Sequence, residues 1–137
     1  MTPATKKAEF RASSHVPPAA VDLAKVSATP LVGTWTNSTS NNVVRAVITD
    51  TGGKFEVNLY GACSPTPCNW GAVGARPYSA TVSGGAAVAF SANYTFSFST
   101  VIVAGHLQGA ELILETLTHF TDGSGRADFY FRETMTK

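Results

Sequence analysis

The chain of 137 residues is long enough for one domain and too short for two full hydrophobic cores. It is 44% hydrophobic and only 14% charged, a balance that argues against disorder over most of its length. A formal net charge of +1 gives no overall field that would attract nucleic acid or an acidic membrane surface, so neither is expected as a partner.

Residues 1–30 are predicted to form a flexible arm ahead of the folded domain. Pro3, Pro17, Pro18 and Pro30 are scattered here among small, polar and basic residues. Only the stretch 21–26 has the pattern of a short helix, and a helix that short is marginal in water unless it docks on the body. The basic residues of the arm are too widely spaced to follow a phosphate backbone.

From residue 31 onward, short alternating runs are separated by Gly, Asn, Asp and Pro, which predicts strands joined by tight turns. The predicted strands cover residues 31–38, 43–49, 54–62, 69–73, 78–83, 87–98, 99–106, 111–121 and 127–134. The clearest alternation places Val88, Phe90, Ala92, Tyr94, Phe96 and Phe98 on one face. No helix is expected after residue 30.

Hairpin succession without a long crossover favours an all-β, antiparallel up-and-down barrel of about eight strands, formed by residues 31–137. Closing the sheet into a barrel removes the exposed edges that such apolar strands would present. A Greek-key β-sandwich is the alternative fold. The interior of a barrel of about eight strands is either filled by side chains or holds one small ligand.

Cys63 and Cys68 are separated by four residues, two of them prolines, which suits a compact turn closed by a disulfide. Two free thiols or a metal site are the alternatives, but a zinc site needs further ligands and the three histidines are scattered singly. A disulfide implies a secreted or periplasmic protein. The N-terminus lacks the apolar core of a signal peptide, so we expect either earlier removal of a signal or another export route.

Three patches of the sequence suggest a family. Residues 31–37, with Trp35 and Asn37, resemble the Gly-x-Trp opening strand of avidins, lipocalins and fatty-acid-binding proteins, and the avidins most closely. Residues 90–100 are similar to the avidin strand that carries a ligand-stacking tryptophan, and residues 132–137 are similar to the last avidin strand. In outline the resemblance spans residues 31–137, and it implies a barrel with a ligand site at its open end.

The sequence also departs from the avidin pattern. Avidins build their biotin pocket with several tryptophans, whereas this chain has only Trp35 and Trp70, and Tyr94 stands at the ligand-stacking position. Residues 112–114 supply no aromatic side chain, and the closing carboxylate would be Glu133. The resemblance therefore implies a binding barrel and leaves biotin as only one candidate ligand.

Two residues are expected to have structural roles at the barrel floor. The resemblance implies that Trp35 plugs the floor and packs against a basic side chain from near the C-terminus, for which Arg132 is the candidate. Asn37 follows Trp35 by two positions and so faces the same side. It is a candidate ligand donor, or else a solvated amide at a strand end.

The remaining ligand-binding candidates are aromatic. Trp70 directly follows the cysteine turn, where it can either cap a pocket or pack over the disulfide. Tyr94 and Phe96 lie on the best-patterned strand and would line the cavity beside it.

Catalytic constellations are weak in this sequence. His119, Asp122 and Ser124 are neighbours, but Asp122 and Ser124 lie in a glycine-flanked turn that would not align a base with a nucleophile. Glu111 and Glu115 share the face opposite to leucines, which indicates a solvated face. The chain has no phosphate loop, zinc-binding helix or dinucleotide fingerprint. We predict that the protein is not an enzyme and uses no cofactor or metal.

Three functions remain open. The leading hypothesis is a non-enzymatic barrel that accepts a small, largely apolar ligand at its open end. The rival is a secreted protein-binding module, such as a protease inhibitor or host-targeting factor, that uses the arm. The third is a structural subunit whose weakly charged surface packs against copies of itself, as a homo-oligomer.

Overall fold

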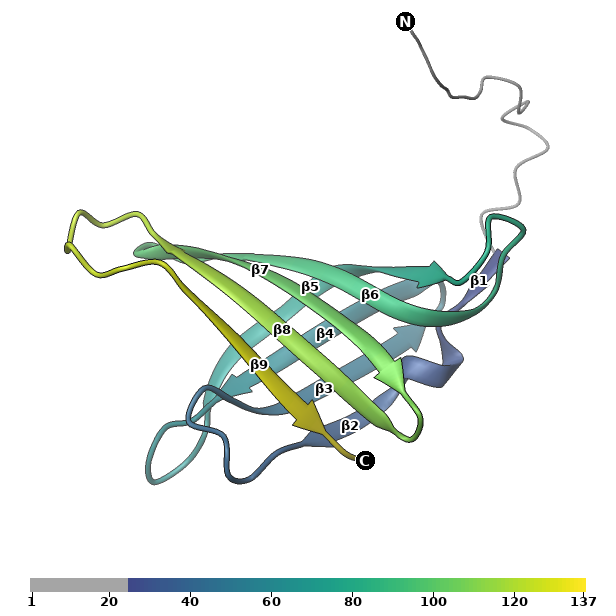
Figure 1. The fold of residues 1–137 in the computed structure, drawn as a ribbon, viewed down its shortest axis with the longest axis horizontal. Helices are drawn as coiled ribbons and strands as arrows, with labels where there is room; N and C mark the ends of the chain where they lie inside the picture. The colour runs from purple at the N-terminus through teal and green to yellow at the C-terminus, as the bar shows by residue number, and fades with distance from the viewer. Residues whose placement is uncertain (1–24) are drawn as a thin grey trace, which may run out of the picture.

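The computed structural model describes residues 25–137, which form an all-β structure with one short 3-10 turn (Figure 1). Its elements are β1 (Val26–Ser27), η3 (Thr29–Leu31), β2 (Gly33–Thr36), β3 (Val43–Thr51), β4 (Lys54–Gly61), β5 (Cys68–Ser79), β6 (Gly85–Thr95), β7 (Ser99–Gln108), β8 (Glu111–Phe120) and β9 (Phe129–Met135). Within this part of the chain, no helix is long and apolar enough to cross a membrane.

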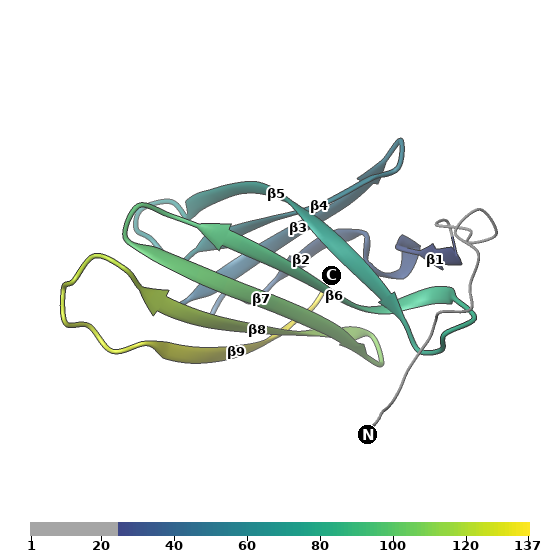
Figure 2. The same cartoon turned by 90° about the horizontal axis from the view of Figure 1, so that it is seen from above.

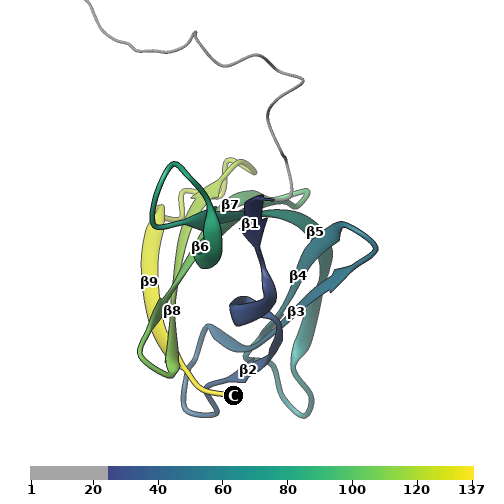
Figure 3. The same cartoon turned by 90° about the vertical axis from the view of Figure 1, so that its right-hand side faces the viewer.

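Strands β2 to β9 form one sheet in sequence order, each antiparallel to the next, and the sheet curls into a nearly closed barrel (Figure 3). Its two ends meet at residues 36 and 136. The Thr36 N–H donates to the Thr136 carbonyl at 2.8 Å, and the Thr136 N–H donates to the Thr36 carbonyl at 3.0 Å. The predicted eight-stranded up-and-down barrel is therefore confirmed, and the sandwich alternative is not formed.

The tight turns explain why consecutive strands pair. The β3–β4 connection has only Gly52 and Gly53 between the strands, with φ angles of 60° and 80°. Positive φ at both central positions matches the twist of a two-residue hairpin, and glycine reaches it without steric cost.

The predicted strands 69–73 and 78–83 are in fact one continuous strand, β5. Its first half pairs with β4 as far as Gly74, and its second half pairs with β6 from Ala75 onward. Pro77 therefore lies where β5 has a partner on one side only, which is the position in which a sheet tolerates proline. Gly74 and Pro77 look like strand breakers in the sequence, but here they mark the point where β5 changes its partner.

The predicted inward face of β6 is correct except at its start. Phe90, Ala92 and Tyr94 are buried, whereas Val88 is 39% exposed and Ala87 is buried instead. The β5–β6 ladder shifts register between Tyr78 and Ser79. This shift leaves Val88 without a partner on β5. Because side chains alternate along a strand, the extra residue turns Ala87 to the inner face and leaves Val88 on the outer face.

One end of the barrel is closed by the N-terminal elements. Strand β1 pairs in parallel with β6, and η3 lies across the barrel end (Figure 3). Leu31 is fully buried there, and the Trp35 indole N–H donates to its carbonyl at 2.9 Å. The last residues of the predicted arm, from Val26, thus belong to the barrel. Residues 1–24, including most of the predicted helix 21–26, lie outside the described residues.

Trp35 is only 2% exposed, as expected of a plug at the barrel floor, but its cationic neighbour differs from the prediction. The Lys137 ammonium lies 5.0 Å from the indole ring centroid, whereas Arg132 is exposed and lies opposite Glu115 in the β8–β9 register. Lys137, not Arg132, supplies the cation. Alternation on β9 explains the difference, because Glu133 and Met135 point inward and Arg132 therefore points outward.

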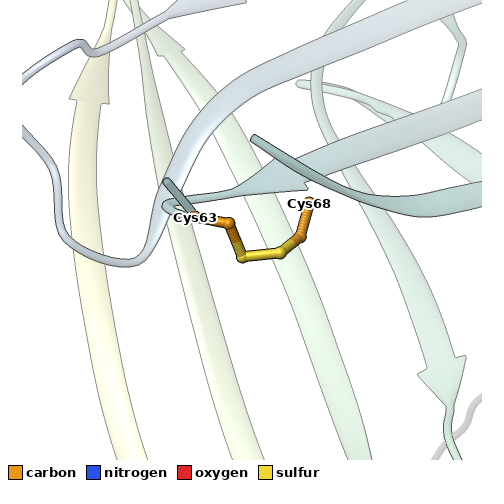
Figure 4. Close-up of a disulfide and its surroundings, with 2 residues drawn as sticks. All are labelled: Cys63 and Cys68. Carbon is orange, nitrogen blue, oxygen red and sulfur yellow. A yellow bond between two sulfur atoms is a disulfide. The ribbon is translucent and has the colours of Figure 1, made fainter. Parts of the chain in front are cut away.

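Cys63 and Cys68 form a disulfide in the loop between β4 and β5, with their Cα atoms 5.4 Å apart (Figure 4). The predicted pairing is confirmed. The bond ties the end of β4 to the start of β5. It therefore fixes the start of the strand that carries Trp70, two residues after Cys68.

Candidate ligand-binding site

The barrel end opposite Trp35 holds a cavity of about 500 Å³. Strand β7 shows the two ends: Ser99 and Val101 at its start line this cavity, whereas Leu107 near its finish lies beside Trp35. The β4–β5, β6–β7 and β8–β9 connections gather at this open end (Figures 1 and 2). The lining residues are Asn42, Asn69, Trp70, Phe96, Phe98, Ser99, Val101, Thr118, Phe120, Arg126 and Phe129.

One wall of the cavity is a stack of aromatic rings. Alternation from β6 into the following turn places Tyr94, Phe96 and Phe98 on the inner face. Their ring centroids are 5.5 and 5.6 Å apart with interplanar angles of 11° and 12°. The Trp70 indole meets the Phe96 ring edge-on at 5.7 Å. Gly61 makes room for it, because a Cβ atom there would lie 2.8 Å from the indole nitrogen.

Trp70 and Phe96 line the cavity, as the sequence suggested, but Tyr94 does not. Tyr94 is 2% exposed and its phenol is fully engaged: it accepts from the Leu59 N–H at 3.0 Å and donates to the Gly71 carbonyl at 2.7 Å. Burial raises the pKa of this phenol, and the Leu59 hydrogen bond offsets part of that effect. Tyr94 therefore supports the wall by linking β6 to β4 and β5.

Asn37 also lies outside the cavity lining. Its amide nitrogen donates to the Thr134 carbonyl at 3.1 Å, and its oxygen accepts from the Thr39 N–H at 3.1 Å and the Thr39 hydroxyl at 2.9 Å. Since Thr134 belongs to β9 and Asn37 directly follows β2, the side chain joins the two strands that close the barrel. The structure thus places Asn37 at the closing seam of the barrel.

A buried carboxylate, Glu133, lies beside this seam; the avidin resemblance implies it only as the closing carboxylate. Glu133 is 4% exposed; one oxygen accepts from the Ser40 hydroxyl at 2.8 Å and the Val43 N–H at 3.4 Å. Its other oxygen has no hydrogen-bond partner, and burial raises the pKa of the group above the usual glutamate value. Asn42, which lines the cavity, donates to the Thr116 hydroxyl at 3.1 Å. Through Asn42, this polar cluster adjoins the cavity.

The β8–β9 loop brings an arginine to the cavity. The Arg126 guanidinium lies 4.0 Å from the Phe120 ring centroid and 5.9 Å from that of Phe98. It donates to the Asp122 carboxylate at 2.8 Å and to the Ser124 hydroxyl at 3.0 Å. From sequence, this segment is expected only to be a turn. The signal that could have revealed it is an arginine in a loop flanked by Phe120 and Phe129.

The residues weighed as a catalytic set have other partners. His119 Nδ1 lies 2.8 Å from the Asp128 carboxylate rather than beside Asp122. Asp122 and Ser124 both bind Arg126, and hydrogen bonds from Ser124 and Arg126 lower the pKa of Asp122. In the described part of the chain, no group of three or more His, Cys, Asp or Glu side chains is placed to hold a metal ion.

No protein-family model matches the chain, and no curated protein or solved structure is significantly similar to it. A nearly closed barrel is common to several unrelated classes of protein, so its shape alone does not identify the avidins. Function is therefore inferred from the side chains at the open end.

Proposed function

We propose that the protein is a non-enzymatic binding barrel that accepts a small, largely apolar molecule in the cavity at its open end. The observation that carries the proposal is that aromatic side chains surround this space without filling it; they are Trp70, Phe96, Phe98, Phe120 and Phe129. Phe98 and Phe129 are 45% and 43% exposed. A ligand that covers these rings removes apolar surface from water, which favours binding.

The size and chemistry of the cavity support the same proposal. A volume of about 500 Å³ lies within the range of typical small-molecule sites. Such sites combine apolar walls with a few polar groups that fix orientation. Here Asn42, Asn69 and Ser99 are the polar neutral residues of the lining that can take that role, together with Thr118.

The test is a fluorescence titration with N-phenyl-1-naphthylamine, a neutral aromatic probe that brightens when it leaves water. Thr118 lines the cavity, so Thr118→Trp should fill it and weaken binding at least tenfold. The matched control is Thr95→Trp, the same substitution at an exposed position on β6 that is not part of the lining. Equal binding by the parent and both variants would overturn the proposal. Biotin, proposed by the avidin resemblance, is tested as a competitor.

The disulfide supports a location outside the reducing cytosol, and we propose that the protein is secreted or periplasmic. In such a compartment the Cys63–Cys68 bond persists and keeps the Trp70 side of the cavity in place. Mass spectrometry of the protein taken directly from its native source, with free thiols trapped on lysis, tests this placement. Reduced cysteines in that sample would contradict it.

A second property, self-association, is favoured by an apolar row on the outer face. Ile102, Leu117 and Tyr130 are 55%, 45% and 53% exposed, and strand register places them side by side across β7, β8 and β9. Exposed apolar rows of this kind are typical of interaction surfaces.

The charges on either side of this row are complementary to a second copy of the chain. Asp128 lies two positions before Tyr130 and Arg132 two positions after it. A two-fold axis along the row therefore brings Asp128 of each copy against Arg132 of the other. Each of the two pairs joins a negative charge to a positive one.

Sedimentation of charge-reversed variants tests the dimer. Asp128→Arg and Arg132→Asp should each sediment as monomers, because like charges then face each other. An equimolar mixture of the two variants should form a heterodimer, since opposite charges meet again. A monomeric parent protein, or a mixture that stays monomeric, would contradict this interface.

A further inference from the structure

Arg126 sets the charge of the cavity mouth. Among the described residues that line the cavity, it is the one charged side chain. Its guanidinium is held against the Phe120 ring at 4.0 Å and is about half exposed, with 51% of the side chain accessible. It thus lies at the border between the aromatic walls and solvent.

The guanidinium keeps donors for a ligand. It has five N–H groups in a planar fork. Within residues 25–137, Nη2 donates to Asp122 and Nε donates to Ser124, and no hydrogen bond from Nη1 is present. A fork with a free edge fits the paired oxygens of a carboxylate, sulfonate or phosphate.

Asp122 orients Arg126 without lining the cavity. It lies four positions before Arg126 in the same loop and contacts it at 2.8 Å. This contact, with the Ser124 hydroxyl, fixes the fork on the Phe120 ring, so less side-chain freedom is lost when a ligand binds. The carboxylate reduces the net charge of the loop, but it is Arg126 that the cavity presents to a ligand.

The arginine also discriminates between two ligand classes that aromatic walls could accept. Rings such as Trp70, Phe96 and Phe98 attract quaternary ammonium groups through their π faces. A guanidinium beside the same rings repels a cation and attracts an anion. The positive charge at the cavity mouth therefore favours anionic ligands over cationic ones.

Resting on the proposed binding function, we infer that the ligand carries an anionic group on its apolar or aromatic body. Arg126 binds the anionic group at the mouth, and the body lies between the Trp70, Phe96 and Phe98 rings. A carboxylate, a sulfonate or a phosphate can each supply this anionic group.

Two probes with the same body test this inference. N-phenyl-1-naphthylamine and 8-anilinonaphthalene-1-sulfonate differ by one sulfonate group. Because hydrogen bonds to a charged group are among the stronger ones, the parent protein should bind the sulfonate about tenfold more tightly or better. Arg126→Gln should remove that preference, because it should weaken sulfonate binding about tenfold more than it weakens binding of the neutral probe.

The control is Arg76→Gln, which removes the same charge from an exposed position on β5 outside the cavity lining and should alter neither affinity. Added salt should weaken sulfonate binding by the parent protein, because screening acts on the exposed part of the contact. Circular dichroism checks that each variant is folded.

The outcomes separate the two proposals. If the neutral probe does not bind the parent protein, the binding function itself fails. If the neutral probe binds and the sulfonate gains nothing, or if Arg126→Gln weakens both probes equally, the cavity binds ligands but the anionic class is wrong.

Discussion

Glu133 places a carboxylate inside the barrel wall with one oxygen unpaired. Burial raises the pKa of Glu133 in the folded state. The native protein therefore binds a proton at this carboxyl group more tightly than the unfolded chain does. The stability it contributes is fully present below the unfolded glutamate pKa of about 4.3 and is lost as pH rises through the raised folded pKa.

Urea unfolding between about pH 4 and pH 8 should therefore show stability falling with pH, by no more than about 1.4 kcal/mol per pH unit from this group. Glu133→Gln should flatten the slope, and Glu111→Gln, at an exposed position, should leave it unchanged. The lowered pKa values of Asp122 and Asp128 act in the opposite sense, but below about pH 4. A slope that survives in Glu133→Gln would contradict this assignment.

Trp35 and Lys137 form a second residue-scale unit, at the closed end. Trp35→Ala removes a large buried side chain and should lower the free energy of unfolding by about 3–5 kcal/mol. Lys137→Ala loses an exposed cation–π contact and should cost about 0.5–1 kcal/mol.

Denaturant unfolding of the double variant tests whether the two residues are coupled. The cost of Lys137→Ala should shrink when Trp35 is already alanine, because the two side chains share one contact. In the monomer, Arg132→Ala should have almost no effect on stability. Full additivity, or a larger cost for Arg132→Ala than for Lys137→Ala, would contradict the packing described here.

At the scale of elements, the cysteine loop should matter more for the cavity than for the fold. The disulfide closes a short loop, so replacing both cysteines by serine should cost less than about 3 kcal/mol. The affinity for N-phenyl-1-naphthylamine should fall further than the stability suggests, because Trp70 loses its fixed anchor two residues away. Intact mass should rise by two hydrogens on reduction of the parent protein. Complete alkylation of both thiols in native, unreduced protein would contradict the bond.

Strands were predictable because a barrel wall alternates between core and solvent. Phe90, Ala92 and Tyr94 follow this alternation, so their burial was evident from sequence. Val88 was not, because a register shift depends on the partner strand rather than on local sequence. The continuation of β5 through Pro77 was likewise not evident, because it depends on β5 having a partner on one side only at that point.

The cavity was only partly predictable for a related reason. Trp70 and Phe96 could be singled out as large aromatics on or beside strands. Asn42 and Arg126 reach the cavity from separate loops, which only barrel closure brings together. Arg132 was the one candidate that the sequence suggested for Trp35, and Lys137 was missed, because the side that each residue of β9 faces depends on the strand register.

At the scale of the whole molecule, stability and binding lie at opposite ends of the barrel. Leu31 of η3 and Trp35 of β2 are buried at one end. At the other end, Phe98 and Arg126 lie in loops and Phe129 begins β9. Substitutions at the open end should therefore change binding with little loss of stability.

The two tryptophans make this division measurable in one experiment. Their indole N–H groups give separate signals in a proton–nitrogen correlation spectrum, with Trp70 at the cavity and Trp35 bonded to the Leu31 carbonyl at the closed end. Titration with N-phenyl-1-naphthylamine should shift the Trp70 signal to saturation and leave the Trp35 signal in place. A Trp70 signal that does not move at saturating probe, or a Trp35 signal that moves in its stead, would contradict the account of an open-ended binding barrel.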